Sequence, residues 1–426
     1  MEHSNKEYDD LGNRIRKNPT NISNDDKSML QDLRLSYKDS LSKIYSEICS
    51  IAHKVDKSCI CTFRLKRIES IISKTIRNPK MNIKRMGDIG GCRCILHKEE
   101  QVYKLYDKIH KLVEKNELSF KIKSEKNYIK EPKVSGYRSI HINVSLKSEN
   151  KQIEIQLRSL EQHNWATLVE ITDLLFGSQL KEYGDKKSPR LFSLHQLLSI
   201  SEDKITIGDK IKIVDIIIKE NYLEEIGSLF NRNYMRVRDA YNKIKLNGKH
   251  FFLISTNNDK VPLIEAFCDY EEAEKAYYEK YLNNSDSNNI LLTSLQKPKF
   301  EKISIAYSNY ILSYNDSYLK ILRYISDLVI NSFSYNKIFR FIKVYKYFLT
   351  AFNERRRKYL EDTSKLNENA NIKNTKRKSK EWNEMIKGHK KQMKYIYDRT
   401  HDGMRFSWRC VIPWCVAKIV ENKFNN

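Results

Sequence analysis

The chain has 426 residues, a length that corresponds to two or three domains of ordinary size. With 40% hydrophobic residues it can bury a core, so global disorder is excluded. Lys and Arg number 78 against 54 Asp and Glu, which gives a net charge of +24. This excess favours polyanionic partners such as nucleotides, RNA, DNA or an acidic surface. The Lys-, Asn-, Ile- and Tyr-rich usage of an AT-rich genome explains the charge equally well.

Cysteine spacing and hydropathy narrow the class further. The eight cysteines include no C-x-x-C pair and no zinc-knuckle spacing, so we expect free, mostly buried thiols in a reducing cytoplasm. The N-terminus, MEHSNKEYDD, lacks the apolar segment of a secretion signal. No apolar run approaches the roughly 18 residues that a membrane span needs. A soluble, cytoplasmic protein is therefore expected, with no membrane partner.

The first 180 residues mix helices with strands. Helical spacing of apolar residues predicts helices over about 24–55, 64–78, 99–113 and 160–176. Short or alternating apolar runs predict strands at 92–96, 120–122, 140–146 and 153–157. Such a mixture is typical of an α+β domain.

The rest of the chain is more helical. After a polar linker, 177–189, helices are expected over 191–201 and about 209–248, followed by a second small α/β unit over 250–325. The tail is rich in Tyr and Lys, and we expect it to be helical or partly disordered. The predicted domains are residues 25–180, 190–325 and 326–426.

Polar residues share one face of a predicted hairpin. The apolar residues of 153–157 alternate with Glu154, Gln156 and Arg158, which must all point the other way. By the same rule His141 leaves the apolar face of the preceding strand. These four side chains indicate either an active site or a solvated outer face, which is the commoner outcome of such alternation.

Two further segments carry candidate binding residues. Asp88 lies just before a Gly-Gly turn that opens a strand bearing Arg93, where a carboxylate either binds a hard cation such as Mg²⁺ or caps the turn. The predicted helix over 64–78 places an apolar stripe on one side. A second side carries Arg64, Arg67, Ser70 and Lys74, while Lys66 points elsewhere. A basic face of this kind binds polyphosphate or is merely solvated.

Five ordered blocks, taken together, resemble a known family. They are RLKRIESIISK, GDIGGCR, YIKEPKVSGYRSIH, EIQLRS and HNWA, and they run from Arg64 to Trp165. In this order they are similar to the synthetase domain of RelA/SpoT-like enzymes, including the small alarmone synthetases and toxin-type relatives. The resemblance covers roughly residues 25–180.

The resemblance implies a nucleotidyltransferase-like fold, a mixed sheet flanked by helices, and transfer of pyrophosphate from ATP to the 3′-hydroxyl of GDP or GTP. Arg64 and Arg93 would then hold the adenine. Lys66 and Lys74 would hold the ATP phosphates, and Ser70 would line the same site. Asp88 and Glu154 would bind Mg²⁺, and Glu154 would also act as the base. Gln156 and Arg158 would lie near the acceptor hydroxyl.

The same resemblance assigns the acceptor to the loop YIKEPKVSGYRSIH. Tyr137 would stack on the acceptor base, with His141 near its ribose or phosphates; the alternative for Tyr137 is packing in the core beside the hairpin. The positive charge for the phosphates would come from Lys130, Lys133 and Arg138. The loop has Ser135 where the family usually carries Asn, and Gly90 replaces the usual Ala.

Three functions are compatible with the sequence. The first is a GTP diphosphokinase-type enzyme without hydrolase activity. The second is a toxin-like relative that pyrophosphorylates the 3′ end of tRNA, which the basic charge and Ser135 would fit. The third is an inactive RNA-binding module, against which the retained Asp88 and Glu154 argue. The sequence leaves open whether the protein forms a homo-oligomer or has an antitoxin or regulatory partner.

Overall fold

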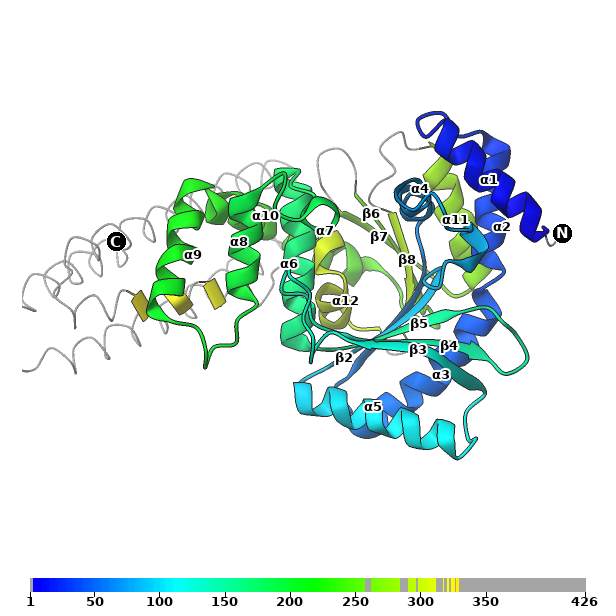
Figure 1. The fold of residues 1–426 in the computed structure, drawn as a ribbon, viewed down its shortest axis with the longest axis horizontal. Coiled ribbons are helices and arrows are strands. Elements are labelled where there is room, and N and C mark those ends of the chain that lie inside the picture. Colours follow the sequence, from blue (N-terminus) through cyan, green and yellow to red (C-terminus); the bar gives the residue numbers. More distant parts are fainter. Residues whose placement is uncertain are drawn as a thin grey trace, which may run out of the picture. The chain divides into compact units, whose positions relative to one another are not determined.

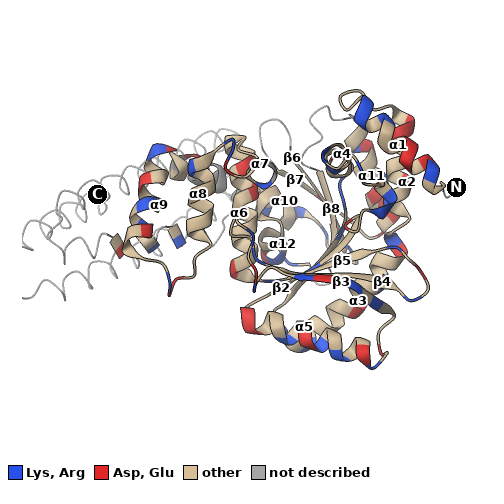
Figure 2. Ribbon diagram, in the orientation of Figure 1, with Lys and Arg blue, Asp and Glu red and all other residues tan. Residues whose placement is uncertain are grey.

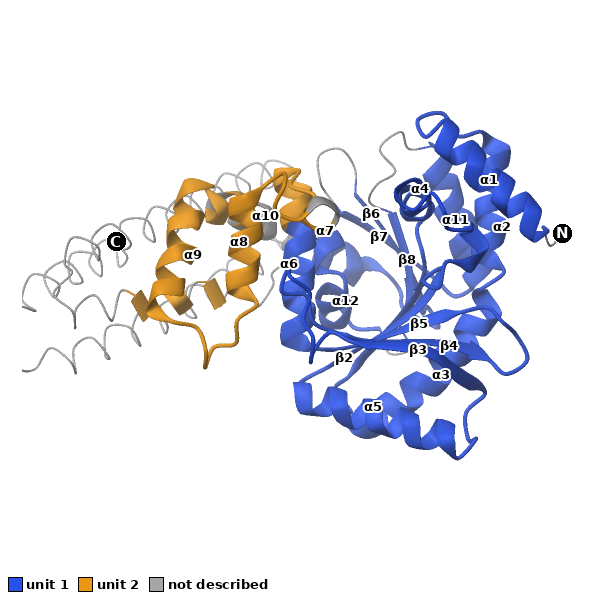
Figure 3. Ribbon diagram, viewed as in Figure 1, with its two compact units in different colours: residues 1–171, 233–315 blue, residues 172–232, 316–426 orange. Residues whose placement is uncertain are grey.

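The structure is a computed structural model. The residues it describes are 3–256, 262–283, 290–295, 298–311, 317, 320, 321, 323–325, 327 and 328. The predicted tail over 326–426 lies, apart from residues 327 and 328, outside this part of the chain. The chain forms two compact units, and each of them combines segments that are distant in sequence (Figure 3). Unit 1 comprises residues 1–171 and 233–315, and unit 2 comprises residues 172–232 and 316–426.

Unit 1 is built on one mixed sheet, drawn in Figure 1. In the described part of the chain the sheet has eight strands in the order β3-β4-β5-β2-β1-β8-β6-β7. Its strands are β1 (Ile60–Leu65), β2 (Gly90–Leu96), β3 (Phe120–Asn127), β4 (Ile140–Leu146), β5 (Ile153–Ser159), β6 (Phe251–Thr256), β7 (Pro262–Phe267) and β8 (Ile290–Ser294). Strands β2 and β5 pair in parallel, whereas β4 and β5 form the antiparallel hairpin that the alternation predicted.

Helices cover both faces of this sheet. Those of unit 1 are α1 (Asn5–Lys17), α2 (Asn24–Leu35), α3 (Lys38–Val55), α4 (Ile68–Arg77), α5 (Glu99–Glu114), most of α6 (Leu160–Phe176), the second half of α10 (Tyr222–Lys243), α11 (Tyr270–Asn283), α12 (Phe300–Ala306) and α13 (Ser308–Ile311). A short 3₁₀ turn, Ile83–Arg85, precedes β2. The sequence did not predict α1, whose capping box between Ser4 and Glu7 fixes its first turn.

Unit 2 is helical in the part that is described. It contains α7 (Leu180–Tyr183), α8 (Pro189–Leu198), α9 (Ile207–Lys219) and the first half of α10 (Tyr222–Lys243). A buried hydrogen-bonded trio joins its segments, because the Thr172 hydroxyl contacts both His195 Nε2 at 2.9 Å and the Tyr222 hydroxyl at 2.8 Å. Burial lowers the pKa of His195 to about 3, so this imidazole is neutral.

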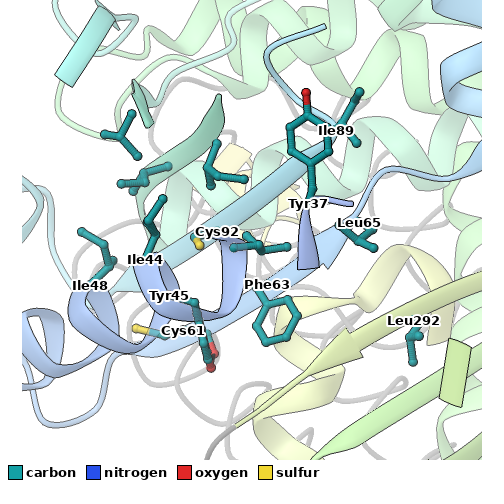
Figure 4. Packing of buried hydrophobic residues seen from close by; sticks show 14 of the residues in the cluster. Tyr37, Ile44, Tyr45, Ile48, Cys61, Phe63, Leu65, Ile89, Cys92 and Leu292 are labelled. Carbon is teal, nitrogen blue, oxygen red and sulfur yellow. Dashed lines mark hydrogen bonds between the residues drawn. The ribbon is translucent and has the colours of Figure 1, made fainter. Parts of the chain in front are cut away.

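The two faces of the sheet bury separate cores. We call the larger one the main core; it lies between the sheet and helices α3, α5 and α11 and includes Ile44, Ile48, Phe63 and Leu292 (Figure 4). Successive residues of a strand point to opposite faces. Phe63 therefore belongs to the main core, while Ile60 of the same strand packs in the second core, with α10, α12 and α13.

The segment that was expected to be a helix over 64–78 begins as a strand. Arg64 lies on β1, and α4 starts only at Ile68. The expected apolar stripe was Leu65, Ile68, Ile72 and Ile76. Leu65 and Ile68 are buried as expected, but Ile72 is half-buried and Ile76 is 37% exposed, because α4 turns Ile68, Ile71 and Thr75 inward. Residues 60–65 satisfy their backbone groups by pairing with β2, and this tertiary pairing outweighs the local helical pattern.

The expected second α/β unit over 250–325 is not separate. Strand β8 pairs with β1 at Phe63 and Ser294, so β6, β7 and β8 extend the same sheet. Strand β7 was missed by the sequence analysis. The predicted boundaries of the three domains stay a prediction. The two compact units do not follow one another along the chain, because each combines two segments that are separated by a segment of the other unit.

Charged residues of both signs alternate along the outer helices. Figure 2 shows Lys and Arg interleaved with Asp and Glu on α1 and α5, so the net positive charge does not gather on these helices. Within the described residues, no helix is both long enough and apolar enough to cross a membrane.

Candidate active site

A pocket opens over β1, β2 and β5, on the face of the sheet opposite the main core. Its volume is about 470 Å³, which includes space open to solvent. Its residues come from the three strands, the turn before β2 and the segment between α12 and α13: Thr62, Arg64, Lys66, Asp88, Gly91, Cys92, Arg93, Glu154, Gln156 and Tyr307. Of the hairpin face predicted from alternation, Glu154 and Gln156 line the pocket, whereas His141 and Arg158 are not among the lining residues.

Asp88 is the acidic centre of one side of the pocket. Lys66 Nζ lies 2.7 Å from Asp88 Oδ2, and Lys74 Nζ lies 2.8 Å from Oδ1. Burial acts to raise the pKa of Asp88, but the two ammonium groups lower it below its usual range. Lys66, which the helical interpretation left unplaced, reaches Asp88 because it directly follows β1.

Glu154 is the acidic centre of the other side and begins a chain of hydrogen bonds. Its Oε1 lies 2.9 Å from His141 Nδ1, and its Oε2 accepts a hydrogen bond of 2.5 Å from Gln156 Nε2. The Tyr137 hydroxyl lies 2.7 Å from His141 Nε2 and accepts a hydrogen bond of 2.6 Å from Arg158. The chain is consistent with Nδ1–H of His141 donating to Glu154 and Nε2 accepting from Tyr137.

Both carboxylates are ionised at neutral pH. Burial acts to raise the pKa of Glu154, but the hydrogen bonds from His141 and Gln156 lower it overall. Asp88 acts on Glu154 in the opposite direction, as a like charge across the pocket. Two carboxylates directed into one pocket are the oxygen ligands that a hard divalent cation requires.

Arginine side chains gather at the inner wall. Arg64 donates a hydrogen bond of 3.4 Å to the Tyr310 hydroxyl, and Arg93 donates one of 3.4 Å to Gln156. Burial, followed by the positive charges of Arg158 and Arg64, lowers the pKa of Arg93 to about 10. Arg93 therefore remains cationic at neutral pH, and the crowding of guanidinium groups favours an anionic ligand.

Some predicted residues lie away from this pocket. Ser70 is half-buried on α4 and is not among the lining residues. Lys130 is exposed in the loop between β3 and β4, and Arg138 is half-buried in the same loop. Lys133 Nζ lies 5.2 Å from the centre of the Tyr137 ring and 4.8 Å from that of Tyr128. The proposed binding roles of these loop residues stay predictions.

Sequence reasoning missed the aromatic wall supplied by the segment 300–311. Tyr307 lines the pocket, and its hydroxyl lies 2.5 Å from that of Thr293 on β8. Arg67 lies 5.6 Å from the centre of the Tyr310 ring. The spacing of Tyr307 and Tyr310 is helical, but nothing in their local sequence indicates that β8 places them beside β1.

One family model matches the segment that carries most of the pocket. Residues 63–173 match the family model described as "Region found in RelA / SpoT proteins". We call this matched segment the RelA/SpoT region. This segment carries Asp88, Arg93, His141 and Glu154, and it spans the strands from the last part of β1 to β5.

Curated relatives match the RelA/SpoT region. A probable GTP diphosphokinase RSH3, chloroplastic, of Oryza sativa subsp. japonica is 36% identical over 101 residues, which cover 24% of this chain and 13% of the relative. The GTP pyrophosphokinase YwaC of Bacillus subtilis (strain 168) is 31% identical over 116 residues, covering 25% and 53% of the two chains. The chain thus spans about half, or less, of the length of these relatives.

Solved structures give a weaker likeness. A GTP pyrophosphokinase family protein from Streptococcus pneumoniae aligns with a TM-score of 0.34 and 24% identity, over 46% of this chain and 98% of that chain. The small alarmone synthetase 1 of Bacillus subtilis bound to its product pppGpp gives 0.32 and 23%, over 38% and 85%.

Proposed function

We propose that the protein is an ATP-dependent pyrophosphotransferase that transfers the β,γ-diphosphate of ATP to the 3′-hydroxyl of GDP or GTP and releases AMP. The observation that carries this proposal is one pocket in which Asp88 and Glu154 face Lys66, Arg64 and Arg93. The relatives of the RelA/SpoT region are named GTP pyrophosphokinases or diphosphokinases, which supports the same reaction.

The reaction requires positioning and charge neutralisation more than covalent chemistry. The acceptor 3′-oxygen bonds to the β-phosphorus, the bond from the α,β-bridging oxygen to that phosphorus breaks, and the hydroxyl proton passes to a base. Negative charge develops on the oxygens around the transferred group. Lys66, Arg64 and Arg93 supply fixed positive charge where such a group would lie.

Donor and acceptor would bind on the two sides of the pocket. Arg64 and Arg93 have flat guanidinium groups suited to an adenine ring, and Lys66 with Lys74 would contact the phosphates. On the other side, Tyr137 would stack on the acceptor base. Ser70 would complete the donor site, and Lys130, Lys133, Arg138 and His141 the acceptor site.

Glu154 is our candidate base for the acceptor hydroxyl. Its lowered pKa keeps it ionised and able to accept a hydrogen bond at neutral pH. The Arg158–Tyr137–His141 chain holds this carboxylate in one orientation, while Gln156 fixes its second oxygen. A base held in this way needs no rearrangement when the hydroxyl arrives.

A divalent metal fits the donor set of the pocket. Asp88 and Glu154 would hold it, and we propose Mg²⁺ because both ligands are carboxylates. When bound, it would neutralise phosphate oxygens. In the structure the ammonium groups of Lys66 and Lys74 form ion pairs with Asp88. These two contacts support the proposal that the Asp88 carboxylate binds a cation.

Transfer of label tests this function directly. The full chain is mixed with Mg²⁺ and ATP labelled at its β-phosphate, and GDP, GTP and deacylated tRNA are offered separately. We expect label on the guanine nucleotide, loss of transfer in Asp88→Asn and retained transfer in the matched control Asp107→Asn, an exposed change on α5. No transfer to any acceptor by the folded wild type would refute the proposal.

The tRNA arm addresses the toxin-type alternative. Lys and Arg outnumber Asp and Glu by 14 within residues 329–426, out of the excess of 24 for the whole chain. Label on tRNA, with a steep loss at higher salt, would assign this charge to an RNA backbone. Label on GDP or GTP at a rate that tolerates salt would leave the small-nucleotide acceptor standing.

A further inference from the structure

A second cluster of reactive side chains lies on the opposite face of the sheet from the pocket. Cys49 and His53 are one turn apart on α3, and Cys61 lies on β1. One ligand atom from each of these three residues falls within 4.8 Å of the others. The described cysteines form no disulfide with one another, and those of this cluster are buried in the main core, where Cys61 lies beside Tyr45 (Figure 4).

Further thiols surround Cys61. Its Sγ lies 3.6 Å from that of Cys59, two residues earlier on the same side of the chain, and 3.6 Å from that of Cys94, its partner on β2. His53 Nδ1 lies 3.4 Å from the Cys49 sulfur and 2.8 Å from the Cys49 carbonyl oxygen. The imidazole is thus fixed beside the thiols while its ring remains half-buried, toward the end of α3.

The spacing of the ligand atoms fits tetrahedral coordination. With zinc–sulfur and zinc–nitrogen distances of about 2.3 and 2.0 Å, a sulfur and a nitrogen of a tetrahedral site lie about 3.5 Å apart. The Cys49 sulfur and His53 Nδ1 are 3.4 Å apart, close to this edge.

We propose that Cys49, His53 and Cys61 bind one soft or borderline cation of the zinc class. One ligand atom of each lies within 4.8 Å of the other two. Two thiolates and an imidazole, with the fourth position left open, are a protein ligand set of zinc. Cys49 and His53 are one helical turn apart and Cys61 lies on a strand, so the usual C-x-x-C search of the sequence does not find this set.

Such a site would join α3 to β1 beneath the candidate active site. Metal binding releases the thiol protons and adds its free energy to folding. The site is independent of the reaction proposed above, because its residues face the main core and none of them lines the pocket.

Metal content and cobalt spectroscopy test this inference. The full chain, purified with a phosphine reductant and without chelator, should contain about one zinc per chain. After removal of this metal, titration with Co²⁺ should give one equivalent with the visible bands of tetrahedral thiolate coordination. His53→Gln, at a half-buried position that is the least disruptive to the core, should weaken Co²⁺ binding by at least about tenfold.

Matched controls separate ligands from neighbouring thiols. Cys92→Ala and Cys94→Ala remove equally buried thiols outside the proposed set and should keep one metal per chain, whereas Cys49→Ala and Cys61→Ala should lose it. Circular dichroism checks that each variant is folded. Folded wild type without zinc and without tetrahedral Co²⁺ bands would overturn the proposal, as would unchanged binding in His53→Gln or a disulfide among these cysteines.

Discussion

The buried ion pair between Arg34 and Glu274 offers a stability prediction that the structure makes quantitative. Arg34 lies on α2 and Glu274 on α11, their side chains are 1% and 4% exposed, and the closest N–O distance is 3.3 Å. Glu274 also accepts hydrogen bonds from Gln31 and Tyr270. Burial acts to lower the pKa of Arg34, but the Glu274 carboxylate raises it overall, so the guanidinium stays charged.

Glu274→Gln keeps the shape of the side chain and removes its charge. One oxygen acceptor becomes an amide N–H₂ that faces donors, and Arg34 is left as a buried cation without a counter-charge. Breaking a buried pair in this way costs about 3 to 5 kcal/mol. A loss of that size lowers the folded-to-unfolded ratio by a factor of roughly 160 to 5,000.

Hydrogen exchange measured by mass spectrometry on peptides of α2 and α11 gives the local opening free energy in the full chain. The matched control is Glu272→Gln, an exposed change on the same helix, which should stay within about 0.5 kcal/mol of wild type. Arg34→Met combined with Glu274→Gln should cost less than the sum of the single changes. A change below about 1 kcal/mol in Glu274→Gln would refute this reasoning.

Four further outcomes are expected. Lys74→Met removes one of the two ammonium groups on Asp88 and should raise the KM for ATP about tenfold in steady-state kinetics, since one charge-assisted contact is lost; an unchanged KM contradicts this role. His141→Gln should lower kcat about 100-fold because Glu154 loses its orienting partner, and wild-type turnover would remove His141 from the mechanism. Because folding lowers the pKa of Asp88 and of Glu154, their ionised carboxylates stabilise the fold above the ordinary carboxyl pKa of about 4, and this stabilisation is lost as the pH falls below it. In urea titrations Asp88→Asn should therefore lose less stability on acidification than wild type. Parallel pH curves for the two proteins would contradict this prediction. Tyr307→Ala should raise the KM for ATP more than the KM for the acceptor, which competing substrate titrations would detect.

Strand alternation was the most reliable guide to the site. It placed Glu154, Gln156 and Arg158 on one face because the period of a strand is fixed by backbone geometry alone. Asp88 was predicted as a site residue because it lies just before a Gly-Gly turn, which is also visible in the local sequence. Arg64 was assigned to a helix because a short apolar run fits both helical and strand periods, and only pairing with β2 decides between them.

Features formed by residues distant in sequence could not be predicted. The aromatic wall at Tyr307 depends on the pairing of β8 with β1, and the hydrogen bond from Arg34 to the Lys66 carbonyl depends on how α2 packs. The sulfur cluster at Cys61 likewise combines a helix with two strands. Neither propensity nor periodicity records such contacts.

The pairing of β1 with β8 has a consequence for how the protein is made. Phe63 and its partner Ser294 are about 230 residues apart in the chain. At about 5 to 20 residues per second, a ribosome needs roughly 10 to 50 s to synthesise the intervening chain. During that interval the edge of β1 that β8 later covers has no partner from this sheet, and an open strand edge invites pairing with other chains. Nascent chains on neighbouring ribosomes are therefore exposed to mispairing at β1, and slower translation after residue 176 would lengthen the period of risk.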